Sequence, residues 1–169
     1  MGDARGFDTL FRADAAAIVG YLRGRGVRDP DDLANEVFVR AFRNIHTVRG
    51  DAARYRSWLF SIARNASIDD ARRRQRRARE TPLDAEVHAV GGDVEAEAIS
   101  HLERTAMRAM LDELAPDQRD VLLLRVVGDL SIEQTAAVVD KSYEAVKALQ
   151  RRGIAALRRK LVPPVHVPQ

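Results

Sequence analysis

Residues 58–77, WLFSIARNASIDDARRRQRR, combine an apolar helical face with a run of positive charge. Guanidinium groups suit phosphate oxygens, to which they donate charge-assisted hydrogen bonds. The side-chain amide of Asn65 both donates and accepts, which suits the edge of an unpaired base. These residue types indicate binding to single-stranded nucleic acid. The local alternatives are a solvated face for the arginines, backbone bonding for Asn65, and a core position for Trp58, which we favour for the tryptophan.

A second group of residues fits duplex DNA. Near the C-terminus the sequence predicts a helix, a tight turn and a second helix, the layout in which the second helix enters the major groove. A plain helical hairpin would give a similar pattern, but the basic residues nearby favour DNA binding. The candidate contacts are Ser142, Tyr143, Glu144, Lys147, Ala148, Arg151 and Arg152.

The net charge of +3 conceals strong segregation of charge along the chain. Residues 54–79 carry nine arginines and two aspartates, and residues 141–160 carry seven bases and one acid. Between them, residues 80–103 carry seven acids and no Lys or Arg. Two basic blocks that flank an acidic strip are typical of a protein that binds a polyanion.

Catalytic and metal-binding patterns are missing from the sequence. There is no cysteine, and His46, His88, His101 and His166 lie too far apart for the usual ligand spacings. No glycine-rich phosphate loop or nucleophile elbow occurs, and capping is the better use for the serines. We therefore expect no enzyme, no metal and no cofactor. The N-terminus lacks the pattern of a signal peptide and no apolar run would span a bilayer, so we expect a cytoplasmic protein.

The elements that hold these residues are predicted to be helices throughout, because no segment alternates like a strand. In the N-terminal half we expect helices over about 7–23, 30–45 and 53–77, with Asp29 as an N-cap and Pro30 at the first helical position. The second helix should bury Leu33, Val37, Phe38, Ala41, Phe42 and Ile45. The third should turn Trp58, Leu59, Ile62, Ala63 and Ala66 inward.

In the C-terminal half helical periodicity resumes near residue 95. Pro116 should start a helix, Ser131 and Gln134 form a capping box, and Ser142 is the expected N-cap of a last helix that Pro163 and Pro164 end. The acidic stretch between the halves is expected to be an exposed linker. The fold class is therefore all-α, with two small helical domains over 1–79 and 95–162, a flexible acidic linker over 80–94 and a tail over 163–169.

Three motifs, taken together, resemble a known family. DDLANEVFVRAFRNI, WLFSIARNASIDDARRR and LAPDQRDVLLLRVVGDLSIEQTAAVV, followed by AVKALQRR and ALRRKL, are similar to bacterial RNA polymerase sigma factors of the sigma-70 family, extracytoplasmic-function group. The resemblance runs over about residues 7–162. It implies two helical domains, called region 2 and region 4, that direct promoter recognition and transcription initiation, with a linker that threads the polymerase's RNA exit path.

The resemblance also implies partners and roles. Core RNA polymerase would bind through its β′ clamp and β flap, and an anti-sigma factor would regulate the protein. The exposed face of the second helix would dock on the clamp, with Asp32, Asn35, Glu36, Val39, Arg40 and Arg43. Region 2 would melt and hold the −10 element, with Arg54, Arg56, Arg64, Asn65, Arg72, Arg73 and Arg76. The helix–turn–helix candidates given above would contact the −35 element.

Departures from the family pattern affect specificity. Asn35 replaces a usual glutamine, Glu144-Ala145 a common Gly-Thr pair, and Leu149 a usual arginine. We therefore expect a −35 preference that differs from that of familiar members. Two other hypotheses remain: an ordinary helix–turn–helix regulator that binds duplex DNA without polymerase, and a nucleic-acid-processing enzyme. A dimerising regulator would need an exposed apolar stripe in its N-terminal half, and an enzyme would need a catalytic constellation.

Overall fold

A computed structural model of the chain describes residues 4–80 and 105–161, with side chains from residue 14 onward. In these ranges all regular structure is helical, which confirms the all-α class. The N-terminal unit comprises α1 (Ala4–Gly24), α2 (Pro30–Asn44), a 3-10 turn η1 (Ile45–Thr47) and α3 (Ala52–Glu80). The C-terminal unit comprises a helical stretch over 105–112, α5 (Pro116–Val126), α6 (Ile132–Val139) and α7 (Tyr143–Leu161).

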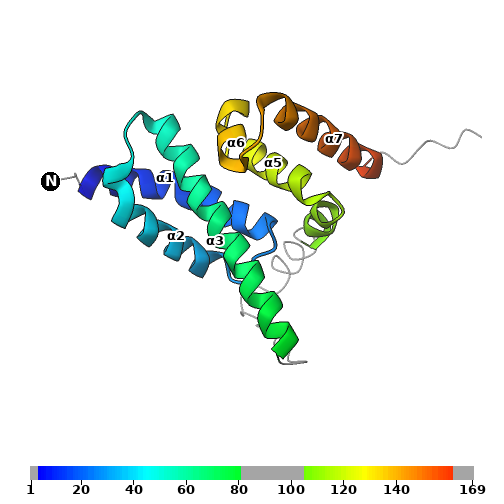
Figure 1. Ribbon diagram of the computed structural model, residues 1–169, viewed down its shortest axis with the longest axis horizontal. Helices are drawn as coiled ribbons and strands as arrows, with labels where there is room; N and C mark the ends of the chain where they lie inside the picture. Colours follow the sequence, from blue (N-terminus) through cyan, green and yellow to red (C-terminus); the bar gives the residue numbers. More distant parts are fainter. Residues whose placement is uncertain (1–3, 81–104, 162–169) are drawn as a thin grey trace, which may run out of the picture.

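The N-terminal unit packs α1, α2 and the first half of α3 around one apolar core (Figure 1). Leu33, Val37 and Ala41 of α2 are buried, as are Leu59 and Ala63 of α3. These positions recur every four residues, so each helix buries one stripe and leaves its opposite face exposed. The last turns of α3 run past the body of the molecule, and its basic end projects into solvent.

Two helix N-caps and one residue in the left-handed backbone conformation determine the shape of the C-terminal unit. Ser131 Oγ accepts from the Gln134 amide at 3.1 Å, and Gln134 Oε1 accepts from the Ser131 amide, which confirms the capping box. The φ angle of Asp140 is +54°, a conformation that Asp tolerates better than most residues. Ser142 Oγ then accepts from the Ala145 amide at 3.2 Å. Together these contacts set the turn between α6 and α7.

Some side chains differ from expectation. Phe42, expected on the buried stripe of α2, is 59% exposed, because it lies beside that stripe, whereas Ala41 on the stripe is fully buried. Trp58 and Ile62 pack against the core but are only half-buried. Asp29 takes the N-cap position of α2 without a side-chain cap bond. The expected linker from residue 81 onward, the start of the next helix and the tail lie outside the described residues.

The two units share a core instead of standing apart. Buried residues of α1 and α3 belong to the same apolar cluster as Val121, Leu123 and Leu124 of α5. A Cβ added at Gly128, which follows α5, would lie 2.6 Å from the Leu124 carbonyl oxygen and 3.2 Å from the Phe60 ring, so glycine is needed for this close approach. The sequence predicted two helical units but not this contact between them.

We expect Ser131→Ala to lower the free energy of unfolding by about 1 kcal/mol, because the Gln134 amide loses its capping acceptor. Urea denaturation followed by circular dichroism measures the loss. Ser57→Ala is the matched control, since that hydroxyl donates only to carbonyls of its own helix, and it should change stability by less than about 0.5 kcal/mol. Equal stability of the two variants would contradict the structural role of the cap.

Candidate functional site

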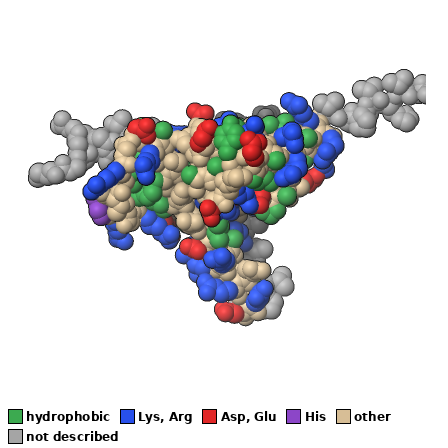
Figure 2. Space-filling view, turned by 45° about the horizontal axis from the view of Figure 1, so that its top comes forward, with side chains coloured by type: hydrophobic (Ala, Val, Ile, Leu, Met, Phe, Trp, Pro, Cys, Tyr) green, Lys and Arg blue, Asp and Glu red, His purple; other side chains and the backbone are tan. Residues whose placement is uncertain are grey.

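The basic end of α3 is an exposed cationic surface. Arg72 and Arg76 are exposed and Arg73 is half-buried, and Arg74 forms an ion pair with Asp70 at 2.9 Å. Figure 2 shows blue side chains gathered on the part of the molecule that projects from the body. Such a surface can contact successive phosphates of a nucleic-acid strand.

A small pocket lies beside Asn65, where α2, η1 and α3 meet. It has a volume of about 370 Å³ and is lined by Arg40, Asn44, Thr47, Trp58, Ile62 and Asn65. Trp58 and Ile62 supply apolar surface. The amide of Asn44 donates to the Arg40 carbonyl at 2.8 Å, and the Thr47 hydroxyl donates to the Asn44 carbonyl at 2.7 Å. These two bonds fix the polar side of the pocket, so the pocket combines a flat ring with hydrogen-bonding groups.

The pocket revises the interpretation of Trp58. Sequence reasoning favoured a core tryptophan, and the side chain does pack against the core and against Tyr55, with the ring centroids 5.9 Å apart. Part of the same side chain also lines the pocket of Asn65. Trp58 therefore serves the core with one part and offers aromatic surface to a ligand with the other.

The candidate helix–turn–helix contacts lie on one exposed side of α7. Tyr143, Glu144, Lys147, Arg151 and Arg152 are all exposed. The Lys147 ammonium lies 5.4 Å from the Tyr143 ring centroid and 3.8 Å from the Glu144 carboxylate. Ser142 is exposed but its hydroxyl caps α7, and Ala148 is half-buried. A groove between α6 and α7 is lined by Ile132 together with Glu144, Lys147, Ala148 and Arg151.

The outer face of α2 carries the remaining candidates. Asp32, Asn35, Glu36 and Arg43 are exposed, and Arg40 is half-buried and pairs with Glu36 at 3.5 Å. Val39 is 49% exposed and lies three residues before the exposed Phe42, so the two are neighbours on the helix surface. This apolar pair inside a polar face is the kind of patch that marks a protein contact. Sequence reasoning named Val39 but assigned Phe42 to the core.

Two of the predicted nucleic-acid contacts are engaged inside the molecule. Arg64 Nε donates to Asp120 Oδ2 at 2.8 Å, and Arg56 Nε donates to the Gly128 carbonyl at 2.8 Å while its Nη1 pairs with Asp14. Arg54 is exposed, and its amide donates to Asp51 at 3.0 Å. The structure therefore places Asn65 at a pocket and places Arg56 and Arg64 between the two units. Arg54 and the basic end of α3 are exposed to solvent.

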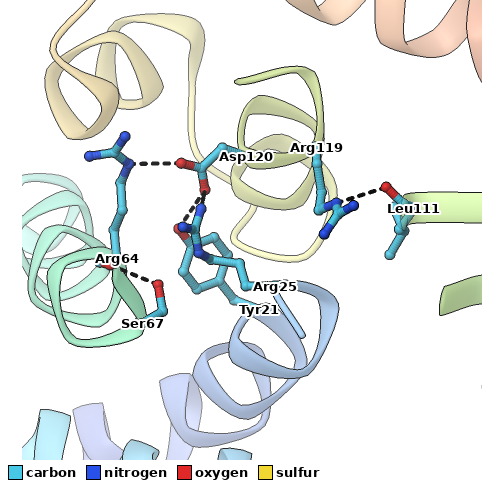
Figure 3. Close-up of polar contacts among 7 residues, drawn as sticks. All are labelled: Tyr21, Arg25, Arg64, Ser67, Leu111, Arg119 and Asp120. Atoms are coloured by element: carbon cyan, nitrogen blue, oxygen red, sulfur yellow. Dashed lines mark hydrogen bonds and ion pairs between the residues drawn. The ribbon is translucent and has the colours of Figure 1, made fainter. Parts of the chain in front are cut away.

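Asp120 is the centre of this contact (Figure 3). Its carboxylate is 3% exposed, and Oδ1 accepts from the Tyr21 hydroxyl at 2.7 Å and from Arg25 Nη1. Arg64 approaches the other oxygen, so one anion of α5 joins a phenol from α1, a cation from the turn that follows α1 and a cation from α3. Sequence reasoning named Arg64 only as a −10 DNA contact and missed its pairing with Asp120, together with Tyr21 and Arg25. The signal was available: a charged residue directly before an apolar run is buried only if it is paired.

Burial shifts two acidic groups of this interface. The pKa of Tyr21 lies well above its ordinary range because the phenol is desolvated and faces the negative charge of Asp120. Desolvation also raises the pKa of Asp14, although the positive charge of Arg56 acts in the opposite direction. Both shifts follow from removing polar groups from water between packed helices.

Among the described residues, no cluster of three or more histidine or acidic side chains is arranged to hold a metal ion. None of the described helices is long and apolar enough to cross a membrane.

Family models match both units. The model described as sigma-70 region 2 matches residues 10–77, and the model described as sigma-70 region 4 matches residues 104–157. The first match covers α2, the Asn65 pocket and most of α3. The second covers α5, α6 and the candidate contacts of α7.

Curated relatives agree with the family models. The chain is 31% identical over 165 residues to the ECF RNA polymerase sigma factor BldN of Streptomyces coelicolor, covering 95% of this chain and 62% of that relative. It is 32% identical over 136 residues to the ECF RNA polymerase sigma factor SigX of Bacillus subtilis, covering 78% of this chain and 70% of the relative. A sigma factor, RpoE, in complex with the anti-sigma factor NepR from Bartonella quintana has a similar fold: TM-score 0.72, 19% identity, 94% of this chain and 98% of that chain.

The buried hydroxyl of Tyr21 predicts a loss of stability at alkaline pH. The folded protein keeps this proton while the unfolded chain releases it above about pH 10. The stabilisation is thus complete below that pH and is lost as the pH rises above it, by up to about 1.4 kcal/mol per pH unit.

Urea denaturation at pH values from about 8 to 11 measures this loss. Tyr21→Phe should make the fall of unfolding free energy with pH less steep, because no titrating group remains at that position. The difference in slope should correspond to about one proton per molecule, or about 1.4 kcal/mol per pH unit. Equal slopes for the wild type and the variant would show that Tyr21 is not sequestered from solvent.

Proposed function

The chain belongs to the sigma-70 family of bacterial RNA polymerase sigma factors, in the extracytoplasmic-function group, and directs transcription initiation; we propose that three of its surfaces divide this work. The outer face of α2 binds core polymerase. The Asn65 pocket and the basic end of α3 hold the −10 element. The exposed side of α7 contacts the −35 element. The pocket beside Asn65 is the observation that carries the proposal.

The pocket suits an extruded base. A base that leaves the duplex needs an aromatic or apolar surface for its ring and hydrogen bonds for its edge. Trp58 and Ile62 offer the first, and the exposed amide of Asn65 offers the second. The basic end of α3 continues the same helix, so a strand that leaves the pocket along α3 meets arginines. This arrangement binds one opened strand and can offset the free energy of unstacking.

The contacts to duplex DNA come from the N-terminal turns of α7. The residues at the start of a recognition helix meet base edges, and the basic residues further along meet phosphates. Tyr143, Glu144 and Lys147 occupy the first positions of α7, and Arg151 and Arg152 follow one turn later. Since Lys147 contacts both Tyr143 and Glu144, its ammonium is partly positioned before DNA arrives. We assign −35 recognition to this side of α7.

We assign the binding of core polymerase to the outer face of α2. This face is polar at its N-terminal end, with Asp32, Asn35 and Glu36, and becomes apolar at Val39 and Phe42 before Arg43. An apolar patch with a charged rim is the usual anatomy of a protein interface. We infer that the β′ clamp of core polymerase covers this face and that the β flap binds the C-terminal unit.

An anti-sigma factor is the regulatory partner that we propose. Support comes from the similar fold of a sigma factor that was solved with an anti-sigma factor. An apolar groove of about 580 Å³ lies between the two units, with walls from α1, the helical stretch over 105–112, α5 and α7. A regulator seated there would hold both units at once. Since its target is the cytoplasmic polymerase, we propose that the protein acts in the cytoplasm, and without catalysis of its own.

Asn65→Ala should slow open-complex formation by about tenfold or more, because the base loses hydrogen bonds worth roughly 1–3 kcal/mol. Affinity for core polymerase should stay unchanged. Permanganate footprinting of the −10 region, with purified core polymerase, measures the opening. A promoter already mismatched at the −10 element should partly rescue the variant.

Ser57→Ala is the control for Asn65→Ala, since it also removes a polar group from α3 but lies outside the pocket. It should open promoters like the wild type. Wild-type melting by Asn65→Ala would exclude the base-holding role and leave the arginines of α3 as its contribution to the −10 region.

Adding positive charge to the outer face of α2 should weaken polymerase binding without unfolding the protein. We expect Asn35→Lys with Glu36→Lys to reduce affinity for core polymerase at least about tenfold, or 1.4 kcal/mol, because two long cationic side chains replace an amide and a carboxylate in the proposed contact. Arg40 is left intact because it also lines the Asn65 pocket. Fluorescence anisotropy with labelled protein measures the affinity, and circular dichroism checks the fold.

Ala16→Lys adds a charge on the exposed side of α1 and is the control. It should bind core polymerase like the wild type. If the α2 variant also binds normally, the polymerase interface lies elsewhere.

A further inference from the structure

We propose that Lys147 of α7 is an acylation site, at which an acyl phosphate such as acetyl phosphate transfers its acyl group to the side-chain amine. The modification removes a positive charge from the side of α7 assigned to the −35 element, and it thereby weakens recognition of that element. The chemical part of the inference depends only on the surroundings of Lys147. The regulatory part rests on the proposed function of α7.

Lysine is rare in this chain. Of its 28 basic residues, only Lys141, Lys147 and Lys160 are lysines, and the others are arginines. A guanidinium keeps its charge and is a poor nucleophile, whereas a lysine amine can lose a proton and attack an acyl donor. Acylation of side-chain amines is therefore confined to these three positions.

Of the three lysines, all in the described part of the chain, only Lys147 lines the groove that runs along α7. This groove has a volume of about 770 Å³, and Glu144, Lys147, Arg151 and Arg158 all line it. Their spacing of three, four and seven residues places them on one face of the helix. Figure 2 shows blue side chains gathered at the end of the molecule that α7 forms. The groove therefore brings an amine, a carboxylate and guanidinium groups together.

The other two lysines are engaged elsewhere. Lys141 Nζ lies 2.9 Å from an Asp117 oxygen, and Lys160 Nζ pairs with Glu113. Each ammonium must leave this ion pair before it can react. Lys147 Nζ lies 3.8 Å from the nearest Glu144 oxygen, which is too long for a direct hydrogen bond. Its amine can therefore turn toward a donor in the groove without breaking a bond.

Arg151 supplies a phosphate site one turn beyond Lys147. Its side chain is exposed and has no hydrogen bond or ion pair with another described residue. A guanidinium binds phosphate oxygens through two parallel hydrogen bonds. In an acyl phosphate a single oxygen joins the phosphorus to the carbonyl carbon. A donor whose phosphate lies on Arg151 can therefore present its carbonyl carbon to the neighbouring amine.

The transfer needs no further reactant. The Lys147 ammonium gives a proton through one water to Glu144, and the neutral amine then attacks the carbonyl carbon. The new N–C bond forms while the C–O bond to phosphate breaks, and the phosphate leaves with the electron pair. The amide nitrogen releases its second proton to solvent. The products are Nε-acyl-lysine, inorganic phosphate and one proton released to solution at neutral pH.

Peptide mapping by mass spectrometry measures the reaction in the full-length protein. With acetyl phosphate, Lys147 should be acetylated about tenfold faster than Lys141 or Lys160, because only Lys147 has a phosphate site beside it. Inorganic phosphate should compete for that site and slow the reaction at Lys147 alone. Equal rates at the three lysines would overturn the proposal.

Arg151→Ala tests the phosphate site, and Arg152→Ala is the matched control, because Arg152 is also exposed but does not line the groove. Arg151→Ala should slow acetylation of Lys147 by acetyl phosphate about tenfold, whereas Arg152→Ala should leave that rate unchanged. With an N-hydroxysuccinimide ester, which carries no phosphate, both variants should react like the wild type. Circular dichroism shows whether the helices are kept. A wild-type rate with acetyl phosphate in Arg151→Ala would contradict the donor site.

Transcription with core polymerase tests the consequence, with each protein compared with its own untreated sample. Wild-type protein acetylated at Lys147 should direct about tenfold less transcript from a promoter that depends on its −35 element, because one DNA contact loses its charge. Lys147→Arg keeps the charge but has no reactive amine, so treatment should not change its output. An equal loss in both proteins would show that the effect comes from another position and would overturn the switch.

The two parts of the inference fail in different ways. The acetylation assay contains neither polymerase nor promoter, so its result does not depend on the proposed function. If Lys147 reacts preferentially but untreated protein directs no promoter-specific transcript, the proposed function fails and the acylation site stands. If untreated protein is active and acetylation at Lys147 does not change its output, the regulatory part fails.

Discussion

A buried carboxylate, that of Asp120, determines how the two units meet. It lies at the contact of α5 with α1 and α3, and it needs donors from both of the latter helices. A buried anion without them would destabilise this contact, so the relative orientation of the units depends on where Tyr21, Arg25 and Arg64 can reach. Apolar packing alone would allow the units to slide. The directional bonds select one arrangement.

This constraint explains why α3 can serve several purposes. Leu59 and Ala63 face the core of the N-terminal unit, Arg64 faces Asp120, and Asn65 faces the solvent pocket. Successive helical residues point about 100° apart, so three neighbouring positions reach three different environments. Beyond the body of the protein the helix has no core to contact, and its exposed arginines need no partner. One continuous helix thereby links the packing of the N-terminal unit, the contact between the units and the proposed nucleic-acid site.

Sequence reasoning predicted the local features and missed the long-range ones. The capping box at Ser131, the cap at Ser142 and Pro30 at the first position of α2 follow from patterns a few residues long, and the structure confirms them. The contact of Asp120 with Tyr21 joins residues 99 apart, and no periodicity encodes such a pairing. Phe42 was misassigned because a stripe defines the direction of a face but not where the bundle stops covering it. The site residues on DNA and polymerase stay predictions.

Arg64 and Asn65 are neighbours on α3 that have different partners. The Arg64 side chain donates to Asp120 of α5 at 2.8 Å, and Asn65 lines the pocket proposed for an extruded base. Because successive helical residues point about 100° apart, the bond that anchors Arg64 to α5 also sets the direction in which Asn65 leaves the helix. The contact between the units therefore contributes to the orientation of the proposed base site, although none of the residues that line the pocket belongs to the C-terminal unit.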